Sequence, residues 1–146
     1  MPRVLGYELQ PGRFYPIITL TLEYQGRFQQ TLAIVDSGAD QTMIPAEVIA
    51  GLGIDVSRLP KAPPNIGAGG ADQRLCDLEV SWRGYVFANR VVVAEAGSLP
   101  IALAGRGELF QKFTVRFAWH KVPPYMDLDP IAGYEPTAGK PTKTHV

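Results

Sequence analysis

Asp36 is the residue of this 146-residue chain whose surroundings could support catalysis. It directly follows residues 32–35, an apolar and β-branched run that predicts a buried strand. A carboxylate at the end of a buried strand is costly unless polar groups hold it, and its nearest cation in sequence is Arg27. We therefore expect backbone N–H groups, a distant part of the chain or a partner chain to hold Asp36.

Ser37 and Gly38 complete a short motif with this aspartate. Ser37 offers a hydroxyl group, and Gly38 allows the backbone to turn tightly around the carboxylate. Taken alone, an Asp-Ser-Gly sequence is most simply an Asx-turn, in which Asp36 caps the turn that leaves the strand. Because short motifs often match by chance, the rest of the chain has to discriminate between a turn and a catalytic site.

The wider pattern resembles the retropepsin-like aspartic peptidases. Residues 34–39, Ile-Val-Asp-Ser-Gly-Ala, are similar to the active-site signature of that family: two apolar residues, Asp, Thr or Ser, Gly, and Ala or Ser. Residues 65–70 resemble its glycine-rich flap, residues 99–106 resemble its later apolar-apolar-Gly-Arg segment, and a short helix and closing strand follow. The resemblance covers residues 14–119. It implies an all-β fold, namely a closed, mostly antiparallel barrel with a flap hairpin and one short C-terminal helix.

Hydrophobic periodicity predicts the elements that position the motif. Residues 18–24 alternate apolar and polar side chains, the Gln25-Gly26 dipeptide turns the chain, and residues 28–35 return it, so this hairpin delivers Asp36 to the end of its second strand. Further strands are expected at residues 73–82, 85–94, 101–104 and 114–119, and short helices at residues 46–52 and 108–112. We divide the chain into an irregular segment (1–13), a peptidase-like domain (14–121) and a Pro-rich tail (122–146) without a core of its own.

The resemblance implies a role for each site residue. Asp36 would be the catalytic carboxylate, the Ser37 hydroxyl would stabilise the paired loops, and the Gly38 N–H would hold the carboxylate. Arg106, next to Gly105, would form a structural ion pair with Asp40, because a guanidinium group suits bidentate capture of a carboxylate. The substrate would contact Ala39, Asp40, Ile66, Gly67, Ala68, Gly69 and Gly70. The flap backbone would bind a peptide by strand addition, although a glycine cluster of this kind is also typical of an ordinary mobile loop.

Aspartic proteolysis needs two carboxylates that face one water molecule, one ionised as the base and one protonated against the scissile carbonyl. The chain holds a single Asp-Ser-Gly and is too short for two such lobes. We therefore expect a homodimer that hydrolyses peptides or proteins as an aspartic endopeptidase. Two alternatives stay open: a weak or inactive peptide-binding and dimerisation module with the same fold, and an unrelated small β-barrel that binds an apolar ligand. The tail is longer than a typical retropepsin end, which leaves open a differently built dimer interface.

Composition argues against several other classes of protein. The 14 basic and 14 acidic residues balance, which gives no indication of a nucleic-acid partner, and no apolar run is long enough to span a membrane. His120 and His145 are too far apart for a metal site, and no cofactor fingerprint is present. The single cysteine, Cys76, cannot form an intrachain disulfide, so we expect a cytoplasmic protein in which Cys76 is a packing residue. We interpret Asp127 and Asp129 as solvated charges in the tail.

Overall fold

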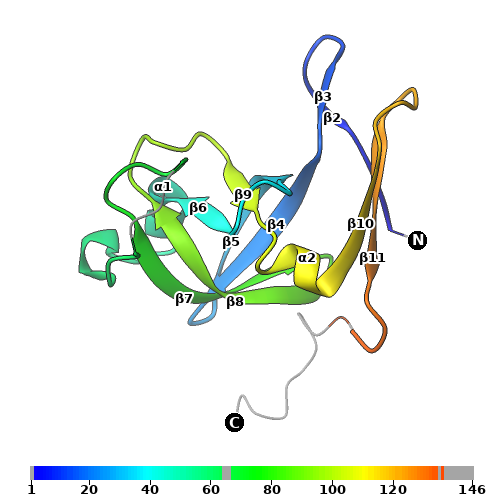
Figure 1. Cartoon of the computed structure of the whole chain (residues 1–146). Helices are drawn as coiled ribbons and strands as arrows, with labels where there is room; N and C mark the ends of the chain where they lie inside the picture. Colours follow the sequence, from blue (N-terminus) through cyan, green and yellow to red (C-terminus); the bar gives the residue numbers. More distant parts are fainter. Residues whose placement is uncertain (1, 64–66, 135, 137–146) are drawn as a thin grey trace.

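The structure is a computed structural model that describes residues 2–63, 67–134 and 136 (Figure 1). Strands dominate, with two short α-helices and one 3₁₀ turn among them. In chain order the elements are β1 (Arg3–Leu5), β2 (Tyr7–Gln10), β3 (Arg13–Tyr15), β4 (Ile17–Tyr24), β5 (Arg27–Val35), β6 (Met43–Pro45), α1 (Ala46–Gly51), η1 (Val56–Arg58), β7 (Arg74–Trp82), β8 (Tyr85–Ala94), β9 (Ala102–Ala104), α2 (Leu109–Lys112), β10 (Phe113–Ala118) and β11 (Tyr125–Pro130). No helix among these described residues is long and apolar enough to cross a membrane.

Six strands close into a barrel in the order β4-β5-β9-β6-β8-β7. The β5–β9 and β6–β8 pairs are parallel, and the remaining pairs are antiparallel. Strand β4 is half-buried, as its alternation predicts. Leu20 and Leu22 are fully buried, whereas Thr19, which precedes Leu20, is exposed. The closed, mostly antiparallel barrel and the short helix after residue 106 are therefore confirmed.

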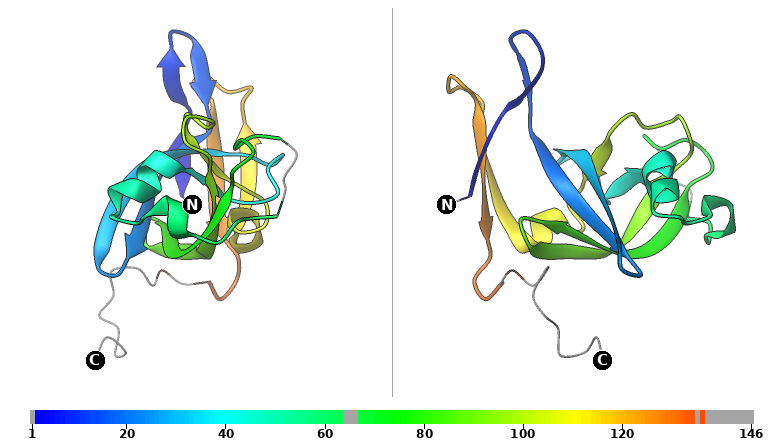
Figure 2. Two further views of the ribbon diagram at one scale, coloured as in Figure 1. Left: turned by 90° about the vertical axis from the view of Figure 1, so that its left-hand side faces the viewer. Right: turned by 180° about the vertical axis from the view of Figure 1, so that it is seen from behind.

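The N-terminal segment is ordered rather than irregular, which corrects our expectation for residues 1–13. Strand β1 pairs antiparallel with β11. Strands β2 and β3 form a hairpin, which we call the arm (residues 7–15); it pairs with no other strand of the described chain and projects from the barrel (Figures 1 and 2). Sequence patterns miss β1 because its partner lies at the far end of the chain and its three residues are too few to show a period.

The tail also begins differently from our prediction. Strand β11 lies between β1 and β10 in a three-stranded sheet, and its Met126 and Leu128 side chains are buried. Asp127, which we expected to be solvated, is wholly buried between two arginines. Its carboxylate accepts hydrogen bonds from Arg3 Nε at 2.8 Å and from Arg116. Residues 125–130 are thus part of the packed structure, because two cations compensate the buried charge.

An aromatic cluster joins this sheet to the barrel. Phe113, the first residue of β10, is buried and contacts the rings of Trp82 and Tyr85 edge-on, at centroid distances of 5.6 and 5.4 Å. Tyr134, which follows β11, packs on Phe113 at 5.5 Å. Edge-on aromatic pairs of this kind add stability beyond the area that they bury. These contacts hold the sheet to the barrel at the turn between β7 and β8.

Candidate active site

Asp36 lies at one end of the barrel, directly after β5. Val35 pairs with Ala104 of the parallel strand β9, and the Asp36 N–H donates to the Ala104 carbonyl at 3.0 Å. The Gly38 N–H donates to Asp36 Oδ1 at 2.8 Å, which is the local bond of an Asx-turn. Asp36 is half-buried. The turn therefore holds the carboxylate through a backbone N–H group, without covering it.

A second loop, residues 105–108, packs against the Asp36 turn. The Arg106 N–H donates to the Ala39 carbonyl at 2.8 Å. A Cβ atom built on Gly105 would lie only 2.5 Å from the carbonyl carbon and oxygen of Gln41. Only glycine permits such a close approach of two backbones. The glycine of the apolar-apolar-Gly-Arg segment is thus required by the contact between the two loops.

Asp40 and Arg106 form the ion pair that we predicted, through Asp40 Oδ1 and Arg106 Nη2. The side chains are 74% and 55% exposed. Exposed ion pairs contribute little to stability, because water screens them and both side chains lose entropy. The backbone bonds between the loops, including that from the Gly107 N–H to the Asp40 carbonyl at 2.9 Å, therefore fix the loops more strongly than this ion pair does.

Thr42 and Glu108 form a buried link that sequence reasoning missed. Glu108 Oε2 accepts hydrogen bonds from the Thr42 N–H at 3.0 Å and from Thr42 Oγ1 at 3.2 Å, while the same hydroxyl oxygen accepts from the Gly105 N–H at 3.2 Å. Thr42 is fully buried. Burial raises the pKa of the Glu108 carboxyl above its ordinary value, and the two hydrogen bonds from Thr42 offset only part of this increase. A polar Thr42 immediately before the buried strand β6 is the only sequence signal that could have indicated this link.

The flap is a short antiparallel hairpin. Lys61 pairs with Arg74, and the Ala62 N–H donates to the Gln73 carbonyl at 2.9 Å. The amide nitrogen of the buried Gln73 donates to the carbonyl groups of Ala68, at 3.1 Å, and Gly70, at 2.9 Å, so this side chain shapes the tip from inside. The predicted flap residue Ile66 lies outside the described residues.

Gly69 and Gly70 have φ angles of 104° and 75°, which L side chains rarely adopt. A Cβ atom on Gly70 would lie 2.3 Å from Glu95 Oε2. The Glu95 N–H donates to the Gly69 carbonyl at 2.8 Å, and the Glu95 carboxylate accepts from the Ala71 N–H at 3.1 Å. Glu95 therefore holds the flap at Gly69 and Ala71, a role that nothing in the sequence pattern indicated.

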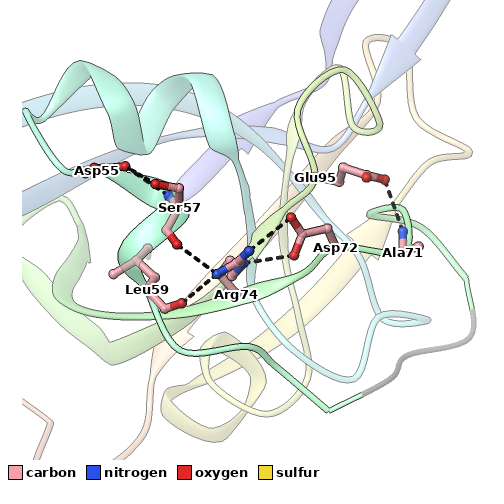
Figure 3. Close-up of polar contacts among 7 residues, drawn as sticks. All are labelled: Asp55, Ser57, Leu59, Ala71, Asp72, Arg74 and Glu95. Carbon is pink, nitrogen blue, oxygen red and sulfur yellow. Dashed lines mark hydrogen bonds and ion pairs between the residues drawn. The ribbon is translucent and has the colours of Figure 1, made fainter.

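The base of the flap is anchored by Arg74 (Figure 3). Its guanidinium forms a bidentate pair with Asp72, at 2.8 and 3.2 Å, and donates to the carbonyl groups of Ser57 and Leu59, at 3.0 Å each (Figure 3). Hydrogen bonds from Arg74 lower the pKa of the Asp72 carboxyl. The loop around η1 and the returning flap strand are thereby tied together. We missed Arg74 because its partners are mainly backbone carbonyls, which carry no sequence signature.

A pocket of about 170 Å³ brings the Asp36 turn and the flap together. It includes six of the predicted site residues: Asp36, Gly38, Ala39, Asp40, Gly67 and Ala68. Gln41, Met43 and Leu103 complete its lining and were not predicted. The other described residues that we predicted for the site do not line the pocket: Ser37, Gly69, Gly70, Gly105 and Arg106. Two carboxylates of the chain, Asp36 and Asp40, line the pocket, and Asp40 forms an ion pair with Arg106.

Other reactive groups do not add to this site. Across the described part of the chain, no three His, Cys, Asp or Glu side chains are grouped so that they could hold a metal ion. Cys76 is buried in the barrel core, and burial, with a contribution from Asp77, raises the pKa of its thiol to about 11. A thiol so protonated is a packing residue and a poor nucleophile.

Comparison with solved structures identifies the fold. A retropepsin-like aspartic protease from Rickettsia conorii matches 86% of this chain and 89% of its own length, with a TM-score of 0.59 and 20% sequence identity. This chain has the retropepsin-like fold. The EIAV protease, solved in complex with the inhibitor HBY-793, matches 70% of this chain and 88% of its own length, with a TM-score of 0.51 and 18% identity. No protein-family model and no curated protein sequence matches the chain.

The retropepsin-like fold accounts for the order of the sequence motifs. The barrel brings the Asp36 turn, the flap and the loop after β9 to one site, although they are separated by about 30 residues or more in the sequence. At 18–20% identity, these comparisons establish the architecture and leave the activity to be argued from the site itself.

Proposed function

We propose that the protein is an aspartic endopeptidase that acts as a homodimer, with one Asp36 from each copy facing a shared water molecule. The observation that carries this proposal is the position of Asp36. Its carboxylate is held by the Gly38 N–H at the end of a barrel strand and lines a pocket shared with flap residues Gly67 and Ala68. Of the two solved structures with this fold, one is named as an aspartic protease and the other as a protease.

The chemistry follows from two carboxylates at close range. Both cannot be ionised together, so the pair shares a proton and titrates as a coupled unit. The ionised carboxylate takes a proton from water as the water attacks the scissile carbonyl, and the protonated one polarises that carbonyl. In this proposal Ser37 stabilises the paired turns, and the flap backbone around residues 67–70 binds the peptide. We also propose a cytoplasmic location, because the single cysteine of the chain cannot form an intrachain disulfide.

A second candidate is a peptide-binding or dimerisation module with weak or no proteolysis. It is supported by the site of a single chain, which brings one Asp36 to a pocket of about 170 Å³ and therefore lacks the second carboxylate that aspartic proteolysis needs. The first candidate requires the second copy and a displacement of the flap to make room for a peptide. The two candidates differ in whether Asp36 performs chemistry.

Digestion of a mixed peptide library at acidic and neutral pH tests the proposal. We expect the wild type to cleave, and we expect Asp36→Asn to retain the fold and lose cleavage entirely. Asp77→Asn is the matched control, because Asp77 is an exposed carboxylate on β7 that pairs with Arg90. Cleavage that persists in Asp36→Asn would exclude this mechanism, and a folded wild type that cleaves nothing would favour the binding module.

A further inference from the structure

Large apolar side chains are exposed at two neighbouring places on the protein. The first is the N-terminal chain that leads into and forms the arm, where Leu5 is 60% exposed, Tyr7 44% and Leu9 52%. The second is the corner between β10 and β11 (residues 117–124), where the rings of Phe117 and Trp119 meet edge-on, with centroids 6.1 Å apart, and are partly exposed. Val122 in the same corner is 99% exposed. Apolar groups gathered in this way mark an interaction surface.

Backbone hydrogen bonds connect the arm, the corner and the Asp36 turn. The arm joins the barrel at Pro16, whose carbonyl accepts the N–H of Val35 at 2.8 Å, one residue before Asp36. Just before the arm, the Gly6 N–H donates to the carbonyl of Pro124 in the corner at 2.8 Å. Figure 1 shows the arm and the corner projecting to the same side of the molecule. A partner that reaches the Asp36 turn from this side would therefore also meet both apolar elements.

The arm lacks the support that a hairpin needs. All four residues of β2 are exposed, and β2 and β3 pair only with each other among the described strands. A two-stranded hairpin alone is at best marginally stable in water, and it needs a further surface to pack against. The sheet of β1, β11 and β10 does not provide that surface through strand pairing, because neither of its edge strands, β1 or β10, pairs with the arm in the described chain.

We propose that the arm and the corner of one chain bind those of a second copy across a two-fold axis, and that this contact sets the two Asp36 turns face to face. The inference rests on the proposed dimeric peptidase, because a second copy is the partner that would complete a site with one Asp36 per chain. A two-fold contact uses the same patch on both copies, so the arm and the corner of each copy become buried by the other copy. The dimer is then built from segments that lie outside the barrel.

Sedimentation over a range of protein concentrations tests this interface. The variants are Leu9→Lys in the arm and Val122→Lys in the corner, each placing a charge at an exposed apolar position. We expect each to raise the dimer dissociation constant at least tenfold, while circular dichroism and the thermal midpoint stay close to the wild type. Phe28→Lys is the matched control, because Phe28 is 66% exposed at the opposite end of β5 from Asp36. We expect a change of less than twofold in this control.

The outcomes separate the interface from the chemistry. Unchanged dissociation constants in both variants, or a wild type that stays monomeric at every concentration, would overturn the interface. Dimers that form in wild type and in Asp36→Asn but weaken in Leu9→Lys and Val122→Lys would support it, even if no peptide is cleaved. If one variant fails to fold, the other still decides, because the two residues belong to different elements.

Discussion

Gly105 is the residue at which the two loops of the site approach each other most closely. We expect Gly105→Ala to lower the free energy of unfolding by about 1–3 kcal/mol, because the new methyl group would overlap the Gln41 carbonyl and the backbone could relieve this only by moving. Gly51→Ala is the control, since a Cβ there would meet only the flexible end of Gln29. Urea denaturation measures both variants, and equal stabilities would contradict the close contact.

For the stability of the site, the exposed ion pair matters less than buried hydrogen bonds and close backbone contact. The resemblance predicted the exposed Asp40–Arg106 pair, yet the buried hydroxyl of Thr42, which follows the Asp36 turn, bonds to two residues of the second loop, Gly105 and Glu108. A buried hydrogen bond that loses one partner leaves a donor or acceptor unsatisfied, which costs more than an exposed ion pair contributes. The stability of the site therefore depends mainly on Thr42, Gly105 and Glu108.

At the scale of elements, Asp127 fixes β11 between its neighbours. Hydrogen bonds from Arg3 and then Arg116 lower the pKa of Asp127 to about 2, from an ordinary value of 3.8. A carboxyl whose pKa is lower in the folded protein stabilises the fold above its unfolded pKa and loses this effect as the pH falls. Asp127 therefore contributes fully above about pH 4, and its contribution is lost between about pH 4 and 2.

Urea denaturation of wild type and Asp127→Asn from pH 6 to pH 2 tests this role. We expect the wild type to be the more stable protein at pH 6, and we expect the difference to shrink as the pH falls below 4. Asp129→Asn, in the same strand but outside the arginine contacts, is the matched control, and we expect its stability at pH 6 to stay close to that of the wild type. If the difference in free energy of unfolding between wild type and Asp127→Asn stays constant from pH 6 to pH 2, the buried Asp127 carboxyl does not titrate as its contacts with the two arginines imply.

At the scale of the whole molecule, activity should belong to the dimer. One chain brings one Asp36, so specific activity should fall on dilution through the dimer dissociation constant. Repulsion raises the second ionisation of the pair and hydrogen bonds lower the first, so the singly protonated form is confined between two apparent pKa values. The rate should then be bell-shaped in pH, with its maximum on the acidic side of neutral.

Peptide cleavage measured alongside sedimentation, over a range of protein concentration and pH, checks both parts of this prediction. Specific activity that stays constant well below the dissociation constant would mean that one chain is sufficient. A rate that rises steadily with pH, without an acidic maximum, would argue against a shared proton.

Local sequence determined the parts of the protein that depend on neighbouring residues. Alternation in residues 18–24 predicts a half-buried strand, and Asp36, Ser37 and Gly38 predict a turn that holds a carboxylate, because both effects act over a few residues. The order of the motifs resembles that of the retropepsin-like peptidases, and this resemblance was sufficient to predict the barrel.

Only the tertiary structure decided which distant segments meet. Strand β11 is too polar to be predicted, yet it is buried because Asp127 is neutralised by Arg3, near the start of the chain, and by Arg116 of the neighbouring strand β10. Gln73, Glu95 and Arg74 acquire roles at the flap because the fold places backbone carbonyl and N–H groups beside them. Such contacts have no period and no fixed spacing. Their energies depend on burial and on partners that only the complete fold brings together.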